Sequence, residues 1–94
     1  MAQKWYEQAL VKKPDDVSVR TDLGLTFFLR EPKDTNRAIK EYKTSLSINP
    51  NHELTLQNLA VAYAEIKDQK GLQETLAKLE KVNPQNQIIQ KLKE

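Results

Sequence analysis

Three short proline-containing segments recur at nearly constant spacing, and they constrain the fold more than any other feature. Pro14 and Pro50 are 36 residues apart, and Pro50 and Pro84 are 34 apart. A period of 20–50 residues is typical of repeat architectures, in which stacked two-element units present an extended surface. The segments read Lys13-Pro14-Asp15-Asp16, Asn49-Pro50-Asn51-His52 and Asn83-Pro84-Gln85-Asn86. Binding is therefore the expected type of function.

The residues between the prolines repeat as well. Leu23-Gly24-x-x-Phe27 recurs 36 residues later as Leu59-Ala60-x-x-Tyr63. Ala38-x-x-x-Tyr42 is echoed by Leu72-x-x-x-Leu76 and, earlier, by Ala2-x-x-x-Tyr6. On these motifs the chain resembles the tetratricopeptide repeat family, whose 34-residue helix-turn-helix units carry W-x2-L-G-x2-Y, then A-x3-F, then P. The resemblance implies an all-α fold, a superhelix (solenoid) of antiparallel helix hairpins.

The sequence departs from the family pattern in three places. The tryptophan slot holds Arg20 in one unit and Leu56 in the other, and Leu72 replaces the usual alanine. The first unit carries two extra residues in its inter-helix turn, within residues 30–34, and loops tolerate such insertions at little cost. Residues 2–14 match the second helix of a unit whose first helix is absent, which favours a piece of a longer protein over a natural short one.

We expect a single domain over residues 1–94, with six helices. Residues 2–14 form the second helix of a truncated repeat, 17–50 the first full repeat, 53–84 the second and 86–93 a closing helix. Proline stops each preceding helix because it lacks an N–H and has a fixed φ, and Asp or Asn after it can cap the next helix. The expected helices span 2–13, 17–30, 35–48, 53–67, 70–82 and 86–93.

Composition excludes several function classes. A net charge of +2 is too small to indicate nucleic acid or membrane lipid as a partner. Cysteine is absent, which excludes disulfides, thiolate metal sites and a cysteine nucleophile. The apolar stretch from Leu23 to Leu29 is too short to span a bilayer, so no membrane insertion is expected. The compartment is undetermined, with a soluble, cytoplasmic protein favoured.

The first helix of each full repeat carries a second apolar stripe, and a helix that is apolar on two sides is covered on two sides. In the resembled family the first helix of each unit lines the concave face, so the second stripes are expected to form a partner-binding groove for a peptide or helix of another protein. Coverage of Leu25, Phe28 and Leu29 by the first helix or by a second copy remains an alternative. The predicted groove residues are Thr21, Leu25, Phe28, Leu29, Leu54, Gln57, Asn58 and Val61.

A carboxylate clamp, made from Lys, Asn and Arg on successive first helices, is a known groove mechanism of the resembled family. Asn58 sits at a matching place, but Thr21 and Leu25 stand where a clamp needs Lys and Asn. A buried carboxylate needs several donors, so no clamp is expected, and Asn58 is interpreted as a polar groove residue.

The sequence contains no recognisable catalytic or metal-binding motif. His52, the single histidine, lies in a turn without a second ligand at metal spacing. Phosphate loops, Ser/His/Asp sets and recessed acid pairs are missing. We therefore expect no catalytic, cofactor-binding or metal site, and a protein that is not an enzyme.

The N-terminal helix suggests a second function. Trp5 is expected to face the side that the absent partner helix leaves bare, and Trp is enriched at binding hot spots. Trp5, Tyr6 and Leu10 are thus candidates for self-association, because an uncapped apolar end of a solenoid tends to associate. The alternative to a peptide-binding scaffold is therefore a homo-oligomerisation module of a larger repeat protein.

Overall fold

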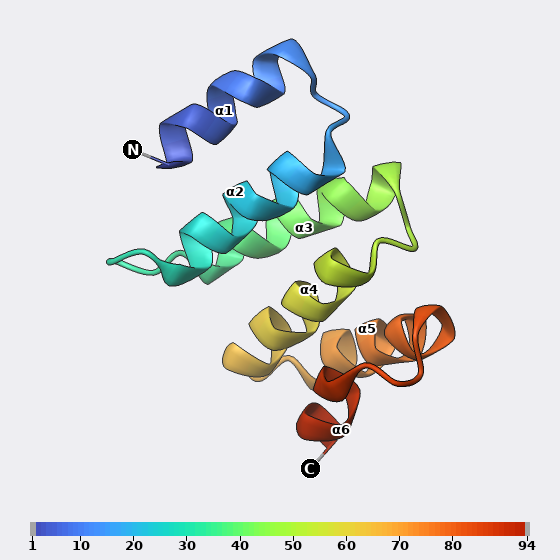
Figure 1. Cartoon of the computed structure of the whole chain (residues 1–94). Coiled ribbons are helices and arrows are strands. Elements are labelled where there is room, and N and C mark those ends of the chain that lie inside the picture. The colour runs from blue at the N-terminus through green and yellow to red at the C-terminus, as the bar shows by residue number, and fades with distance from the viewer. Residues whose placement is uncertain (1, 94) are drawn as a thin grey trace.

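The structure is a computed structural model that describes residues 2–93. All regular secondary structure in this range is helical. The prediction of six helices is confirmed, with bounds shifted by at most two residues. From the first helix to the fifth, successive helices reverse direction, and the first and last helices lie at opposite ends of the stack (Figure 1). The helices are α1 (Ala2–Lys12), α2 (Val17–Leu29), α3 (Thr35–Ile48), α4 (Glu53–Glu65), α5 (Gln69–Val82) and α6 (Gln87–Lys93).

The helix ends follow from local chemistry. The Asp16, Asp34 and Asp68 carboxylates each accept a hydrogen bond from the backbone N–H three residues later, at 3.1, 3.0 and 3.0 Å. His52 begins α4 without a side-chain cap. The expected end of α4 at residue 67 is too late, because Lys67 adopts a φ of 60° and the Asp68 N–H turns back to bond the Tyr63 carbonyl.

The three proline corners share one hydrogen-bond pattern. In each, an N–H just before the proline donates to the carbonyl four residues earlier. A second N–H, two residues after the proline, donates to the carbonyl three residues earlier. The first bonds are Lys13 to Ala9, Asn49 to Ser45 and Asn83 to Leu79, and the second are Asp16 to Lys13, His52 to Asn49 and Asn86 to Asn83. Residues 9, 45 and 79 are therefore structurally equivalent.

The helices pack in two unequal layers. α2 packs against α3, and α4 against α5, while α1 contacts α2 and α3 contacts α4. α2 also contacts α4, and α4 contacts α6. Within residues 2–93, by contrast, no Cα atoms of α1 and α3, or of α3 and α5, approach within 8 Å. The layer formed by α2, α4 and α6 is thus the tighter one, and the packing is consistent with a helical repeat.

The core lies between the two layers and is built from the predicted repeat motifs. Gly24 is required there, because a Cβ atom at this position would lie 2.6 Å from the ring of Tyr42. Burial raises the pKa of the Tyr42 phenol. The buried apolar residues are Leu10, Leu23, Phe27, Ala38, Ile39, Tyr42, Leu56, Leu59, Ala60, Ala62, Tyr63, Leu72, Leu76, Leu79 and Ile89.

Arg20, in the tryptophan slot, joins an ion-pair network. Its guanidinium donates to the Glu41 carboxylate at 2.9 Å and to the Pro14 carbonyl at 3.1 Å. Arg37 contacts the second Glu41 oxygen at 2.9 Å. The buried Glu41 carboxylate is therefore compensated by two guanidinium groups, as a buried charge requires.

Candidate functional site

The predicted groove residues lie on the layer formed by α2, α4 and α6, where α2 and α4 contact each other directly. Leu25, Phe28 and Val61 are half-buried. Leu29 is 67% exposed and Leu54 is 48% exposed. We call the surface formed by these five residues and the half-buried Asn58 the α2–α4 face. It combines apolar side chains from two neighbouring helices with one side-chain amide.

Thr21 does not belong to this surface. Its side chain is completely buried, and its hydroxyl lies 2.6 Å from the Thr55 hydroxyl and 3.4 Å from that of Ser45. The sequence pattern placed Thr21 on the second stripe of α2. The structure corrects this, because α3 and α4 close over that position and its polar group is satisfied internally.

Gln57 is less available to a binding partner than the sequence predicted, because its side chain already takes part in a hydrogen bond. Its carbonyl oxygen accepts a hydrogen bond from the Asn86 amide at 3.1 Å. The same amide donates to Glu53 at 2.7 Å, and the Asn83 amide does so at 2.8 Å. These hydrogen bonds lower the pKa of the Glu53 carboxyl. The network ties the start of α4 to the α5–α6 corner.

Lys33 is a residue of this surface that the sequence analysis missed. Its ammonium lies 4.7 Å from the centre of the Phe28 ring and 3.0 Å from the Glu65 carboxylate. Lys33 therefore crosses from the α2–α3 turn to the end of α4 and closes one end of the α2–α4 face. The available signal was the two-residue insertion in this turn, which makes the turn protrude.

The predicted self-association residues separate into three environments. Trp5 is 61% exposed, and the neighbouring Val11, which was not predicted, is 83% exposed. Tyr6 is half-buried and packs against the core. Leu10 is buried in the core, so its assignment to an outer surface is wrong. A hollow of about 500 Å³ lies along the bare side of α1, lined by Trp5, Gln8, Ala9, Val11 and Lys12.

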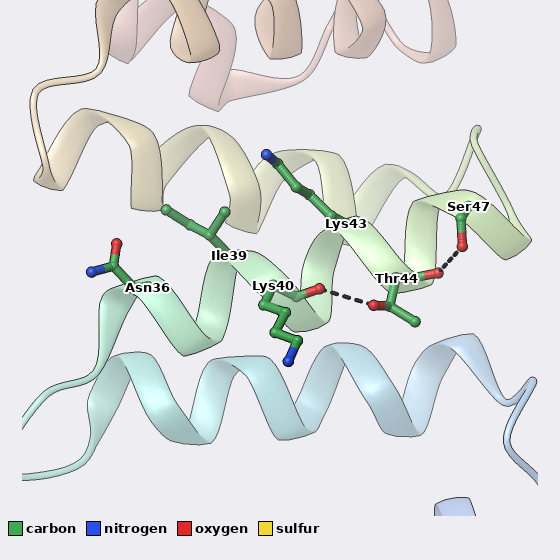
Figure 2. Close-up of a pocket in the computed structure, with 6 residues that line it drawn as sticks. All are labelled: Asn36, Ile39, Lys40, Lys43, Thr44 and Ser47. Atoms are coloured by element: carbon green, nitrogen blue, oxygen red, sulfur yellow. Dashed lines mark hydrogen bonds between the residues drawn. The ribbon is translucent and has the colours of Figure 1, made fainter.

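A second hollow of about 500 Å³ lies along α3. Figure 2 shows that Ile39 and Lys43 point to one side of the helix and Lys40 to the other. The Thr44 and Ser47 hydroxyls donate to backbone carbonyls of their own helix, at 3.0 and 2.7 Å. Because one helix supplies all the lining residues, no polar groups converge from different elements, as ligand sites usually require.

Residues 2–93 contain no group of three or more His, Cys, Asp or Glu side chains placed to hold a metal ion. Over the same range, each helix falls short of the length and apolar character that crossing a bilayer requires.

Comparison with known proteins gives a partial relationship. No family model matches the chain. A protein named "Uncharacterized protein ycf37", from Pyropia yezoensis, is 35% identical over 72 residues, which cover 77% of this chain. The matched region spans only 39% of that protein's length. The chain is therefore similar to part of a larger protein, and the name of that protein gives no activity.

Proposed function

We propose that the chain is a non-catalytic protein-interaction module of tetratricopeptide-repeat type, which binds a peptide or helix of a partner protein along the α2–α4 face. One observation carries the proposal. Two adjacent helices, each with an apolar side already buried in the core, leave further apolar side chains partly open to solvent. Isolated exposed leucines are ordinary, but Leu25, Phe28, Leu29, Leu54 and Val61 lie on two helices that contact each other, which favours an interaction surface.

The layering supports a concave form for this face. α2, α4 and α6 touch in succession, whereas α1, α3 and α5 stay apart within the described residues. A stack that is tighter on one side curves toward that side, and repeat proteins use the resulting concavity for binding. The expected superhelix of hairpins would therefore present the α2–α4 face inward.

The side chains favour an amphipathic ligand. Leu25, Phe28 and Val61 form a half-buried apolar floor, which suits the apolar side of a helix. Asn58 offers an amide for a hydrogen bond, and Lys33 and Glu65 mark a charged end. A helix with three apolar anchors at successive turns and a polar residue at one end fits this arrangement best.

The test measures binding of a captured partner to variants. Proteins retained by the chain are identified by mass spectrometry, and one is purified for titration. Val61→Glu and Leu25→Glu place charges on the floor, so each should weaken binding at least about 10-fold, the effect of roughly 1.4 kcal/mol. Ile48→Glu is the matched control, because Ile48 is 43% exposed and belongs to α3, a helix of the other layer.

Two results would contradict the proposal. One is binding that survives both glutamate substitutions while the helical circular dichroism is unchanged. The other is a tight dimer in light scattering that Leu25→Asp and Phe28→Asp convert to a monomer, because the face would then be occupied by a second copy.

A further inference from the structure

Asp22 is a charged residue on the same side of α2 as the apolar residues of the α2–α4 face. It precedes Leu25 by three positions and Leu29 by seven, and residues at these spacings share one side of a helix. Leu29 is 67% exposed, so this side opens to solvent. The buried Gly24 and Phe27 lie on the side of α2 that is turned to the core. Asp22 therefore borders the α2–α4 face.

The Asp22 carboxylate has no partner among residues 2–93. The residue is half-buried, and the Thr26 hydroxyl bonds its backbone carbonyl rather than its side chain. The two acidic residues of α4 are both engaged within the same range. Glu53 accepts hydrogen bonds from two side-chain amides, and Glu65 pairs with Lys33. Because a carboxylate partly removed from water is stabilised by a nearby cation, Asp22 keeps an unused capacity for one.

Asn58 shows that this position stays open beside a neighbouring helix. Asp22 and Asn58 are 36 residues apart, the same offset that separates Leu23 from Leu59. α2 contacts α4, and Asn58 nevertheless remains half-buried. A further helix placed beside α2 in the way that α2 lies beside α4 would therefore leave the Asp22 carboxylate within reach of a ligand.

Charge is distributed unequally between the helices of the face and the helices behind them. α4 contains two carboxylates and no basic residue. The basic residue of α2, Arg20, is directed to Glu41 on α3. Basic residues outnumber acidic ones on the other layer, by three to one on α3 and three to two on α5. Although the chain carries a net charge of +2, α2 and α4 together are acidic, and complementary charge favours a basic ligand there.

We propose that the segment bound along the α2–α4 face is a basic amphipathic helix, in which an arginine or lysine pairs with Asp22 beside apolar anchors that contact Leu25 and Val61. This inference rests on the peptide-binding function proposed above and adds the charge of the partner. Arginine suits the position best, because its guanidinium can donate two parallel hydrogen bonds to one carboxylate. An acidic helix would bring like charges together at Asp22, so the face selects by charge as well as by apolar contact.

The probe is a displayed library of amphipathic helices whose apolar positions are all leucine and whose other positions vary freely. It is selected on the full chain and, separately, on Asp22→Asn and Asp22→Lys. The wild type should retain helices enriched in arginine and lysine at a fixed distance from the leucines. Asp22→Asn should abolish this enrichment, and Asp22→Lys should reverse it toward acidic residues.

Glu74→Gln is the matched control for the loss of one negative charge. Glu74 is exposed on α5, a helix of the other layer. Its substitution lowers the total negative charge of the chain as much as Asp22→Asn does. Glu74→Gln should therefore retain the preference of the wild type for basic helices, and a loss of that preference would overturn the inference.

Titration of one selected helix measures the charge pair directly. Asp22→Asn should weaken binding about 10-fold, as loss of a hydrogen bond to a charged group predicts. Replacing the arginine of the helix by glutamine should weaken binding to the wild type by the same factor but have little effect on binding to Asp22→Asn, which is the signature of a direct contact. The effect of Asp22→Asn should decrease at high salt.

Val61→Asn separates this inference from the peptide-binding function, because it removes an apolar contact without changing the charge. Helices that lose affinity for Val61→Asn but show no preference for basic residues, or the same preference on Asp22→Asn, would overturn the inference alone. Binding that Val61→Asn leaves unchanged would overturn the peptide-binding function, and the inference with it. A wild-type chain that retains no helix from the library would do the same.

Discussion

At the scale of single residues, Gly24 sets how closely α2 and α3 pack. Glycine inside a helix costs about 1 kcal/mol relative to alanine, so Gly24→Ala would be stabilising on an open helix surface. Here the new Cβ would lie 2.6 and 2.9 Å from two atoms of the buried Tyr42 ring. Overpacking of this kind typically costs about 1–3 kcal/mol. We expect a net loss of about 1 kcal/mol in urea unfolding.

A second substitution separates the two effects. The equivalent slots in the next hairpin hold Ala60 and Leu76, both buried, so alanine is tolerated where a leucine replaces the tyrosine ring. In a Tyr42→Leu background, Gly24→Ala should therefore raise the unfolding free energy by about 1 kcal/mol. A loss of equal size in both backgrounds would show that the ring is not the cause.

The sequence placed Gly24 in a repeated motif but gave no role to Arg20. The same slot holds Gly24 in one unit and Ala60 in the other, and the structure explains the small residue at position 24 by the nearby Tyr42 ring. Arg20 was recognised only as a departure from the tryptophan slot. Its partner, Glu41, is 21 residues away in the sequence. The ion pair between Arg20 and Glu41 depends on the burial of Glu41 against α2, and no local sequence pattern indicates that burial.

At the scale of elements, Glu53 links the first turn of α4 to the α5–α6 corner. Hydrogen bonds from Asn83 and Asn86 lower the pKa of its carboxyl in the folded state. A lowered folded-state pKa stabilises the protein above the unfolded-state pKa, and this contribution is lost as the pH falls through the folded value. Relative to Glu53→Gln, the wild type should lose stability from about pH 5 downward, since ordinary Glu titrates near 4.3.

Urea unfolding of the two proteins at a series of pH values measures this difference. Glu80→Gln is the control, because Glu80 pairs only with Lys93 on an exposed surface and should change the pH dependence little. A constant difference between wild type and Glu53→Gln from pH 7 to pH 3 would contradict the assignment.

Local sequence signals predicted some of the helix ends correctly and missed another. The sequence predicted a cap at an Asp after Pro14, and Asp16 accepts the expected hydrogen bond; Asp34 accepts the equivalent one at the start of α3. The end of α4 was placed two residues too late, because Lys67 occupies a left-handed position that glycine usually marks. A sequence without glycine at that point carries no boundary signal.

At the scale of the whole molecule, a buried hydroxyl pair joins the two hairpins. The Thr21 and Thr55 hydroxyls lie 2.6 Å apart and completely buried, and His52 Nδ1 lies 2.6 Å from the latter. We expect Thr21→Val and Thr55→Val to be non-additive in urea unfolding, with a coupling energy of about 1 kcal/mol.

Thr44→Val combined with Thr55→Val is the reference pair. The Thr44 hydroxyl bonds only the Lys40 carbonyl of its own helix, so this pair should be additive within about 0.5 kcal/mol. Additivity of the Thr21 and Thr55 substitutions as well would mean that the hydroxyl pair does not connect the hairpins.

The sequence predicted part of the exposure pattern at the candidate site. Helical spacing placed Leu25 and Phe28 on one stripe of α2 and Val61 on the matching stripe of α4, and all three are half-buried; their role in binding stays a prediction. Helical spacing failed for Thr21 and Leu10, since burial there depends on which neighbouring helix covers the position. Lys33 could not be assigned either, because its contacts with Phe28 and Glu65 depend on the path of an inserted turn.

The unequal layering has a mechanical consequence. α1, α3 and α5 make no close backbone approach to one another within residues 2–93, and the two hairpins are joined chiefly where α3 packs against α4. The angle between the hairpins is therefore set by the side chains of that one contact. A substitution that widened it would change the curvature of the α2–α4 face, although none of the face residues had been altered.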